Sequence, residues 1–97
     1  MFTFNPPTTA QLAIALHGQI TILRLPAVLK RRGRSRSSHY ADIKEGLFVA
    51  PVLIGSRAVG TPEHEVDALN SARIAGRSDE DIRALVVKLE AARHDTV

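Results

Sequence analysis

The chain has 97 residues, of which 44% are apolar and none is cysteine, and its formal net charge is +3. This length allows one folded domain with a small core, but not a deep cleft between two lobes. The lack of cysteine excludes a disulfide framework and thiolate zinc sites, and it fits a reducing cytoplasm. No apolar run is long enough to span a membrane, and the start of the chain lacks the basic residues of a signal peptide, so we expect no membrane partner.

The charges are divided unevenly along the chain. Residues 1–41 contain six Arg or Lys and no acidic residue, whereas residues 42–97 contain seven basic and ten acidic residues, a net charge of −3. A one-sided distribution of this kind predicts an anionic partner, with DNA or RNA as the leading candidates. The alternative is a solvated basic loop that binds nothing.

The first nineteen residues carry the weakest signals. The Asn-Pro-Pro sequence at 5–7 interrupts regular structure, and Thr8 or Thr9 could cap a short helix over residues 10–17. The β-branched segment at residues 19–23 predicts a short strand.

Two short helices joined by a tight turn are predicted between Leu25 and Gly46. The proline of the sequence LPAVLKRRG suits a first helical turn, and Gly33 can adopt the left-handed conformation that ends a helix. Ser35 can cap a second helix, which Gly46 closes. Two helices separated by a short glycine-containing turn form a helix-turn-helix. Six of the thirteen basic residues lie in or beside it: Arg24, Lys30, Arg31, Arg32, Arg34 and Arg36.

The pattern becomes extended after Gly46. Two short strands around a two-residue loop, Gly55-Ser56, predict a β-hairpin over about residues 52–60 with a type II′ turn. A hairpin that directly follows a helix-turn-helix is a wing. Arg57 lies just past the tip, where its guanidinium could contact a phosphate oxygen or a minor groove, or could simply pair with a neighbouring carboxylate.

Two further helices are predicted after the hairpin. Thr61-Pro62 begins the first, with the hydroxyl as its cap, and Gly76 ends it. Residues 78–81 (SDED) open the second helix with a start like a capping box. Its apolar residues recur at i, i+3, i+4 and i+7 and form the clearest amphipathic stripe of the chain: Ile82, Leu85, Val86 and Leu89.

The C-terminal stripe is too apolar to stay in water, because each buried aliphatic side chain contributes roughly 1.5–3 kcal/mol. It packs either on the protein's own helices or on its copy in a second chain. We favour a homodimer, because a small DNA-binding module gains affinity and half-site spacing from two-fold symmetry.

The order helix, turn, helix, hairpin, helix, with these residues, resembles the AlpA-type phage transcriptional regulators. The resemblance covers about residues 22–77 and depends on the segments LRLPAVL, SRSS, IKEG, GSRAVG and EVDAL, and on Tyr40, Phe48 and Pro51. It implies a winged helix-turn-helix related to MerR-like and excisionase-like DNA-binding proteins. Prophages and integrative elements encode such proteins, which control excision or integrase expression.

The chain departs from the family pattern at four positions. Arg34, His39 and Asp42 stand where the family has apolar residues that pack the second helix on the first, and Thr61 replaces an aromatic residue. A buried unpaired charge is costly, so each charged group must reach solvent, find a partner or be neutralised. The second helix could therefore be shifted, shortened or loosely held.

On the second helix, Ser37, Tyr40, Ala41 and Lys44 share a face roughly opposite His39 and Asp42. If His39 points to the core, this polar face meets the major groove, where hydroxyl and ammonium groups contact phosphates and base edges. The alternative role for Tyr40 is packing through its ring. The residues that we predict to contact double-stranded DNA are Lys30, Arg31, Arg32, Arg34, Arg36, Ser37, Ser38, Tyr40, Lys44 and Arg57.

Enzyme chemistry has no candidate residues in this sequence. The four histidines are scattered, and the side chains of Glu63-His64-Glu65 would point in different directions from a helix, so we expect no metal, cofactor or small-molecule substrate. Two functions remain. One is a sequence-specific transcriptional regulator of a prophage or integrative element, acting on excision or integrase expression. The other is a protein-interaction module that keeps the winged fold without specific DNA readout.

The predicted fold class is mainly α with a small β-hairpin. A winged helix-turn-helix domain occupies residues 20–76. An N-terminal extension at residues 1–19 precedes it, and a C-terminal amphipathic helix at residues 77–97 follows it.

Overall fold

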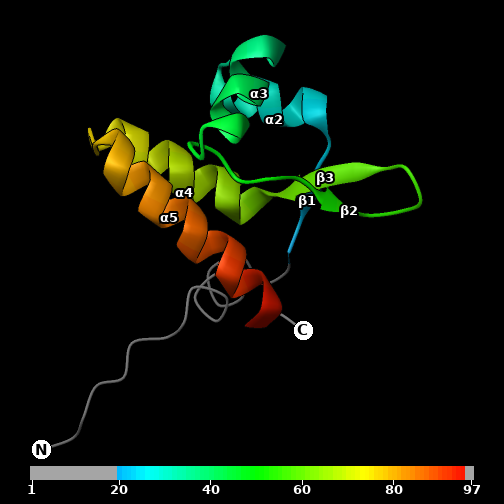
Figure 1. The fold of residues 1–97 in the computed structure, drawn as a ribbon. Helices are drawn as coiled ribbons and strands as arrows, with labels where there is room; N and C mark the ends of the chain where they lie inside the picture. The colour runs from blue at the N-terminus through cyan, green and yellow to red at the C-terminus, as the bar shows by residue number, and fades with distance from the viewer. Residues whose placement is uncertain (1–19, 96–97) are drawn as a thin grey trace, which may run out of the picture.

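The computed structural model describes residues 20–95, so the helix expected at residues 10–17 lies outside the described part of the chain. The mainly helical fold with a small sheet is confirmed (Figure 1). The elements, in chain order, are β1 (Ile22–Leu23), α2 (Leu25–Arg32), α3 (Arg36–Lys44), β2 (Val52–Leu53), β3 (Val59–Pro62), α4 (Glu63–Ile74), α5 (Asp79–Ala92) and the short 3₁₀-helix η1 (Arg93–Asp95).

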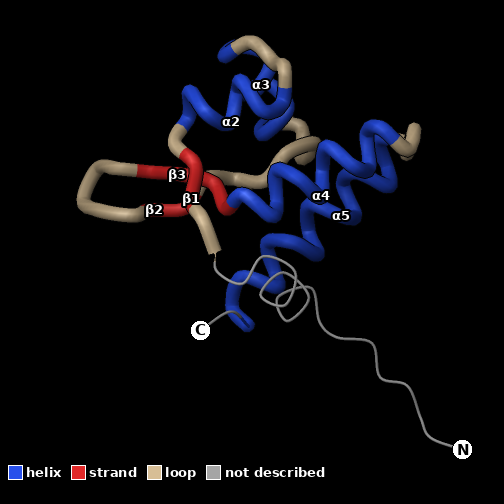
Figure 2. The backbone as a smooth tube through the Cα atoms, turned by 180° about the vertical axis from the view of Figure 1, so that it is seen from behind, coloured by secondary structure: helices blue, strands red, loops and turns tan. Residues whose placement is uncertain are grey.

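The three strands form one antiparallel sheet in the order β1-β3-β2. Ile22 of β1 pairs with Pro62, and Val52 of β2 pairs with Gly60, so β3 is the central strand. Figure 2 shows the three strands in red, gathered beside the helices. A Cβ atom on Gly60 would lie 2.5 Å from Cγ2 of Ile22 and 3.0 Å from the carbonyl oxygen of Leu23. The close approach of β1 to β3 therefore requires glycine at this position.

The hairpin between β2 and β3 is present, but the prediction of a two-residue type II′ turn is wrong. The amide of Ile54 donates to the carbonyl of Ala58 at 2.9 Å, which leaves three residues, 55–57, in the loop. A type II′ turn needs a positive φ at its first central residue, and Gly55 does not have one.

The start of α4 also differs from the prediction. Thr61 belongs to β3 and is buried, and α4 begins at Glu63 with Pro62 as its N-cap and no side-chain cap. The amide of Glu63 donates instead to the carbonyl of Thr21 at 2.8 Å. The first turn of α4 is thus satisfied by the backbone beside β1, because β3 continues directly into the helix.

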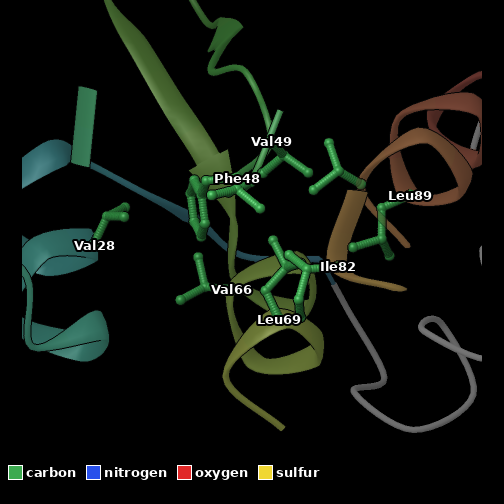
Figure 3. Close-up of a cluster of buried hydrophobic side chains, with 9 residues drawn as sticks. Val28, Phe48, Val49, Val66, Leu69, Ile82 and Leu89 are labelled. Atoms are coloured by element: carbon green, nitrogen blue, oxygen red, sulfur yellow. The ribbon is translucent and has the colours of Figure 1, made fainter. Parts of the chain in front are cut away.

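The core lies between the helical hairpin of α4 and α5 and the segment that follows α3 (Figure 3). Phe48 and Val49 point from that segment toward Val66 of α4 and Ile82 of α5. Val28 is the buried residue of α2 and connects the helix-turn-helix to this cluster. The complete set of buried apolar residues is Val28, Leu47, Phe48, Val49, Val66, Leu69, Ile82, Val86 and Leu89.

The amphipathic stripe of α5 packs within its own chain. Ile82, Val86 and Leu89 are 1%, 5% and 2% exposed, and Leu85 packs against the same cluster. Figure 1 shows α5 running alongside α4. The four residues expected at a homodimer interface are therefore covered within their own chain, and the homodimer itself stays a prediction.

Polar contacts tie α5 to the loop between α3 and β2. The carboxylate of Glu90 accepts from the amide of Ala50 at 2.8 Å, and the guanidinium of Arg93 donates to the Ala50 carbonyl at 2.7 Å. Arg83 donates to the carbonyl of Glu45 at 3.0 Å. The end of α3 and the start of the hairpin thus both depend on α5 for their position.

One buried ion pair joins α4 to η1. Arg93 donates to both carboxylate oxygens of Glu65, at 2.6 and 2.9 Å, and Glu65 is fully buried. The hydrogen bonds to Glu65 raise the pKa of Arg93. A bidentate pair of this kind satisfies a carboxylate that would otherwise be costly to bury.

Candidate nucleic-acid interface

The helix-turn-helix consists of α2, a three-residue turn and α3. Gly33 ends α2 in the left-handed conformation, with φ 68°, and its amide donates to the carbonyl of Leu29. Ser35 caps α3 by accepting from the amide of Ser38 at 3.2 Å. Both signals were predicted from the sequence and are confirmed.

A polar cluster of Arg32, Arg34, His39 and Asp42 packs α3 onto α2. One guanidinium nitrogen of Arg32 lies 2.7 Å from Oδ2 of Asp42, and the other lies 2.8 Å from Nδ1 of His39. Arg34 donates to both oxygens of Asp42, at 3.1 and 2.9 Å. The guanidinium of Arg32 also lies 3.9 Å from the ring centroid of Phe48, which places this cation on an aromatic face.

These contacts change the titration of the cluster. Burial by itself would raise the pKa of Asp42, but the hydrogen bonds from Arg34 and Arg32 outweigh it, and the pKa falls below its usual value. Burial, followed by the charge of Arg32, lowers the pKa of His39. His39 therefore stays neutral and accepts the hydrogen bond from Arg32, which can only donate.

His39 and Asp42 both point inward, so the opposite face of α3 is presented to solvent. Ser37, Tyr40 and Lys44 lie on that face and are exposed, while Ser38 is half-buried. Tyr40 is 50% exposed, and the edge of its ring meets the ring of His39 at a centroid distance of 5.4 Å. The Tyr40 ring is thus partly packed, as in the alternative role predicted for it. The face of α3 that carries Tyr40 is nevertheless exposed to solvent.

The hairpin lies next to this open face. A small cavity of about 60 Å³ is lined by Tyr40 of α3 and by Pro51, Val59 and Gly60 around the hairpin. In Figure 1 the hairpin extends away from the helices, with its loop farthest out. Arg57 is exposed in that loop.

The predicted basic contacts fall into three groups. The side chain of Arg32 is 8% exposed and pairs with Asp42, and Arg31 pairs with Glu63 and Asp67, each at 3.1 Å. Arg34 pairs with Asp42, but 44% of its side chain remains exposed to solvent. Within residues 20–95, no ion pair holds the remaining four cations: Lys30, Arg36, Lys44 and Arg57.

Sequence reasoning missed the side chains that pair with the inward-facing cations. Glu63 and Asp67 of α4 were not predicted to pair with a cation, yet they lie beside Arg31 of α2. Asn70, one further turn along α4, donates to the carbonyl of Arg31 at 3.1 Å. The spacing of Glu63, Asp67 and Asn70, which places all three on one side of the helix, was the available signal.

Within the described residues, no group of His, Asp or Glu side chains is arranged to hold a metal ion. The helices of that same part of the chain are all too short or too polar to cross a bilayer.

Comparison with known proteins identifies the family. The sequence model described as Prophage CP4-57 regulatory protein (AlpA) matches residues 21–74. The chain is also 37% identical over 71 residues to a protein of Enterobacteria phage P4 described as "Uncharacterized protein ORF88", an alignment that covers 73% of this chain and 81% of the phage protein. No solved structure matches the chain significantly. With more than half of its length matched, the chain belongs to the AlpA family of prophage regulatory proteins.

Proposed function

We propose that this protein is a sequence-specific DNA-binding transcriptional regulator of a prophage or integrative element, acting on excision or integrase expression. The observation that carries the proposal is that α3 has one side packed on the protein and one polar side exposed to solvent. Its inner side is fixed by Asp42 and His39, and its outer side presents Ser37, Tyr40 and Lys44 to solvent beside the hairpin. A rigid helix with an open polar face is what insertion into a major groove requires.

The unpaired cations supply the electrostatic part of the proposal. Lys30, Arg36, Lys44 and Arg57 are exposed on α2, α3 and the hairpin loop. Contacts from these side chains to phosphate oxygens would position the protein, and Ser37 and Tyr40 would reach base edges. Arg31 and Arg32 contribute less directly in this proposal, because their guanidinium groups are engaged within the protein.

Fluorescence anisotropy with labelled duplexes tests the proposal. The duplexes carry the DNA upstream of the protein's own gene, the DNA upstream of an adjacent integrase gene, and a scrambled sequence. The triple variant Arg36→Gln, Lys44→Gln, Arg57→Gln should bind every duplex more weakly. Its slope of log K against log salt should be shallower by about 2.7 if each cation neutralises one phosphate.

The matched control is the double variant Arg77→Gln, Lys88→Gln, which removes exposed cations near and on α5. It should leave both affinity and salt slope close to those of the unmodified protein. Equal weakening by the two sets would contradict an interface at α3 and the hairpin.

The protein-interaction alternative is favoured by one observation, the use of Arg31, Arg32 and Arg34 in ion pairs within the protein. It predicts no duplex binding even at low salt. The same anisotropy titration therefore distinguishes the two functions.

A further inference from the structure

A polar cavity of about 390 Å³ lies beside the helix-turn-helix. It is lined by Arg32, Arg34, Asp42, Leu47, Asn70 and Arg73, which come from α2, the turn, α3, the segment after it, and α4. Asp42 lies about 140–160° around α3 from Ser37, Tyr40 and Lys44 at 100° per residue, so the cavity opens on the other side of that helix.

The lining of the cavity is strongly cationic. Three guanidinium groups face one carboxylate, which leaves a net charge of two positive units. Both oxygens of Asp42 are already occupied by Arg32 and Arg34. The partner of Arg73 is Asp79, at 3.1 Å, which lies outside the lining and has a 59% exposed side chain.

The charges of Arg34 and Arg73 act on Arg32. Burial is the main cause of a lowered pKa for Arg32, Asp42 opposes this shift, and the charges of Arg34 and Arg73 lower the pKa further. Like charges brought this close repel, and an anion between them would relieve that repulsion.

Donors remain for such an anion. A guanidinium has five N–H groups, of which Arg34 uses two on Asp42 and Arg73 uses one on Asp79. Forked guanidinium groups match the oxygens of a phosphate. A phosphate monoester carries about 1.5–2 negative charges at neutral pH, close to the charge of the lining.

We propose that this cavity binds a phosphate group, supplied by a small phosphomonoester. A backbone phosphate of DNA offers the same chemistry, but the cavity lies on the side of α3 away from the face proposed to meet DNA. A ligand here would contact Arg34 and Asp42, the residues that orient α3, so its binding would act on that helix. Phosphate binding itself does not depend on DNA binding.

The test is an NMR titration of the full chain with inorganic phosphate, at constant ionic strength set by chloride. The signals to follow are the side-chain N–H groups of Arg32, Arg34, Arg73 and Asn70. They should shift in a saturable manner, while the backbone amide of Ser37 and the side-chain N–H groups of Arg57 stay in place. Shifts that grow linearly without saturating would overturn the proposal.

Arg73→Gln should weaken phosphate binding by about tenfold or more, because it removes a charged donor from the lining, and the Arg73 side chain is 44% exposed. Arg77→Gln, an exposed arginine outside the lining, is the matched control and should leave the affinity unchanged. A second variant, Asn70→Asp, adds a negative charge to the cavity and should also weaken binding. Equal phosphate affinity in all three variants would refute the site.

A titration with a short duplex distinguishes the two sources of phosphate. Shifts confined to α3 and the hairpin support a small phosphomonoester as the ligand. Shifts of the Arg73 and Asn70 side chains that inorganic phosphate reverses would instead assign the cavity to the DNA backbone and overturn the choice of a small molecule.

Discussion

Arg34 donates to both carboxylate oxygens of Asp42, at 3.1 and 2.9 Å, across the turn that separates α2 from α3. The family resemblance led us to expect apolar residues at both positions and at that of His39, which reaches the same cluster through Arg32. The three departures therefore compensate one another. Within the described residues, no buried side-chain nitrogen or oxygen lacks a hydrogen-bond partner. The contact that holds α3 on α2 is therefore polar where we expected an apolar one.

Asp42→Ala tests how far the protein depends on this contact. The substitution leaves Arg32 buried without its carboxylate, so the free energy of unfolding should fall by about 3–5 kcal/mol. Urea denaturation followed by circular dichroism measures the change. Asp67→Ala is the matched control, because it breaks an exposed pair with Arg31 and should shift the urea midpoint little. Similar midpoints for the two variants would show that Arg32 finds another partner.

Replacing the whole cluster should cost less than breaking it. A variant with Leu at positions 32, 34, 39 and 42 removes every charge and hydrogen bond together. Apolar groups of similar volume often equal or exceed a buried ion pair in stability. This variant should therefore unfold at a higher urea concentration than Asp42→Ala. If its midpoint is lower, the polar cluster contributes stability that apolar packing cannot supply.

His39 should make the stability of the protein sensitive to mild acid. Its pKa is lowered from 6.5 by burial and by Arg32, with Asp42 opposing and Arg34 reinforcing the shift. Below about pH 6.5, the histidine of the unfolded chain binds a proton, whereas His39 in the native protein does so only at a lower pH. The stabilising contribution of neutral His39 is therefore complete above about pH 6.5 and is lost as the pH falls. Urea midpoints should therefore decrease between about pH 7 and about pH 5.

The variant His39→Leu should flatten this decrease. His94→Gln, a change at an exposed histidine, should leave it in place. A decrease of the same size in His39→Leu would assign the acid sensitivity to other groups.

The local elements of this fold could be predicted from the sequence, whereas their partners could not. Capping residues and apolar periodicity predicted α2, α3 and α5, because these signals act within a few residues of the chain. The helix α4 was also predicted, but its start was not, since Thr61 belongs to β3 and does not cap it. The loop of the hairpin was predicted too short, since its length depends on the strand register and not on the Gly55-Ser56 sequence alone. Pattern alone also could not show that Arg34 and Asp42 pair, because their contact bridges a turn.

The same limit applies to the basic cluster. Six cations near one another predicted a nucleic-acid surface, but composition does not show which way each side chain points. The structure turns Arg31 toward Glu63 and Asp67, acids that are more than thirty residues away in sequence. A periodic stripe likewise shows that α5 buries a face, but not whether the partner is α4 or a second chain.

The last prediction concerns α5, which lies beyond the residues that match the family. Leu89 is 2% exposed in the core shared with α4, so Leu89→Ala should lower the free energy of unfolding by about 2–5 kcal/mol. Val87 lies on the same helix but is 68% exposed, and Val87→Ala should change it by no more than about 0.5 kcal/mol.

Truncation after Arg77 makes the stronger test, because it removes the partners of Phe48, Val66 and Leu69 together with Arg93, the partner of Glu65. The truncated chain should lose its cooperative unfolding transition. Sedimentation equilibrium on the full chain, on Leu89→Ala and on the truncated chain separates this role from dimerisation. If α5 only completes its own core, Leu89→Ala lowers stability without changing the mass of the full-length particle. A full-length dimer that becomes a folded monomer on truncation would show instead that the stripe can leave α4 and serve as an interface between two chains.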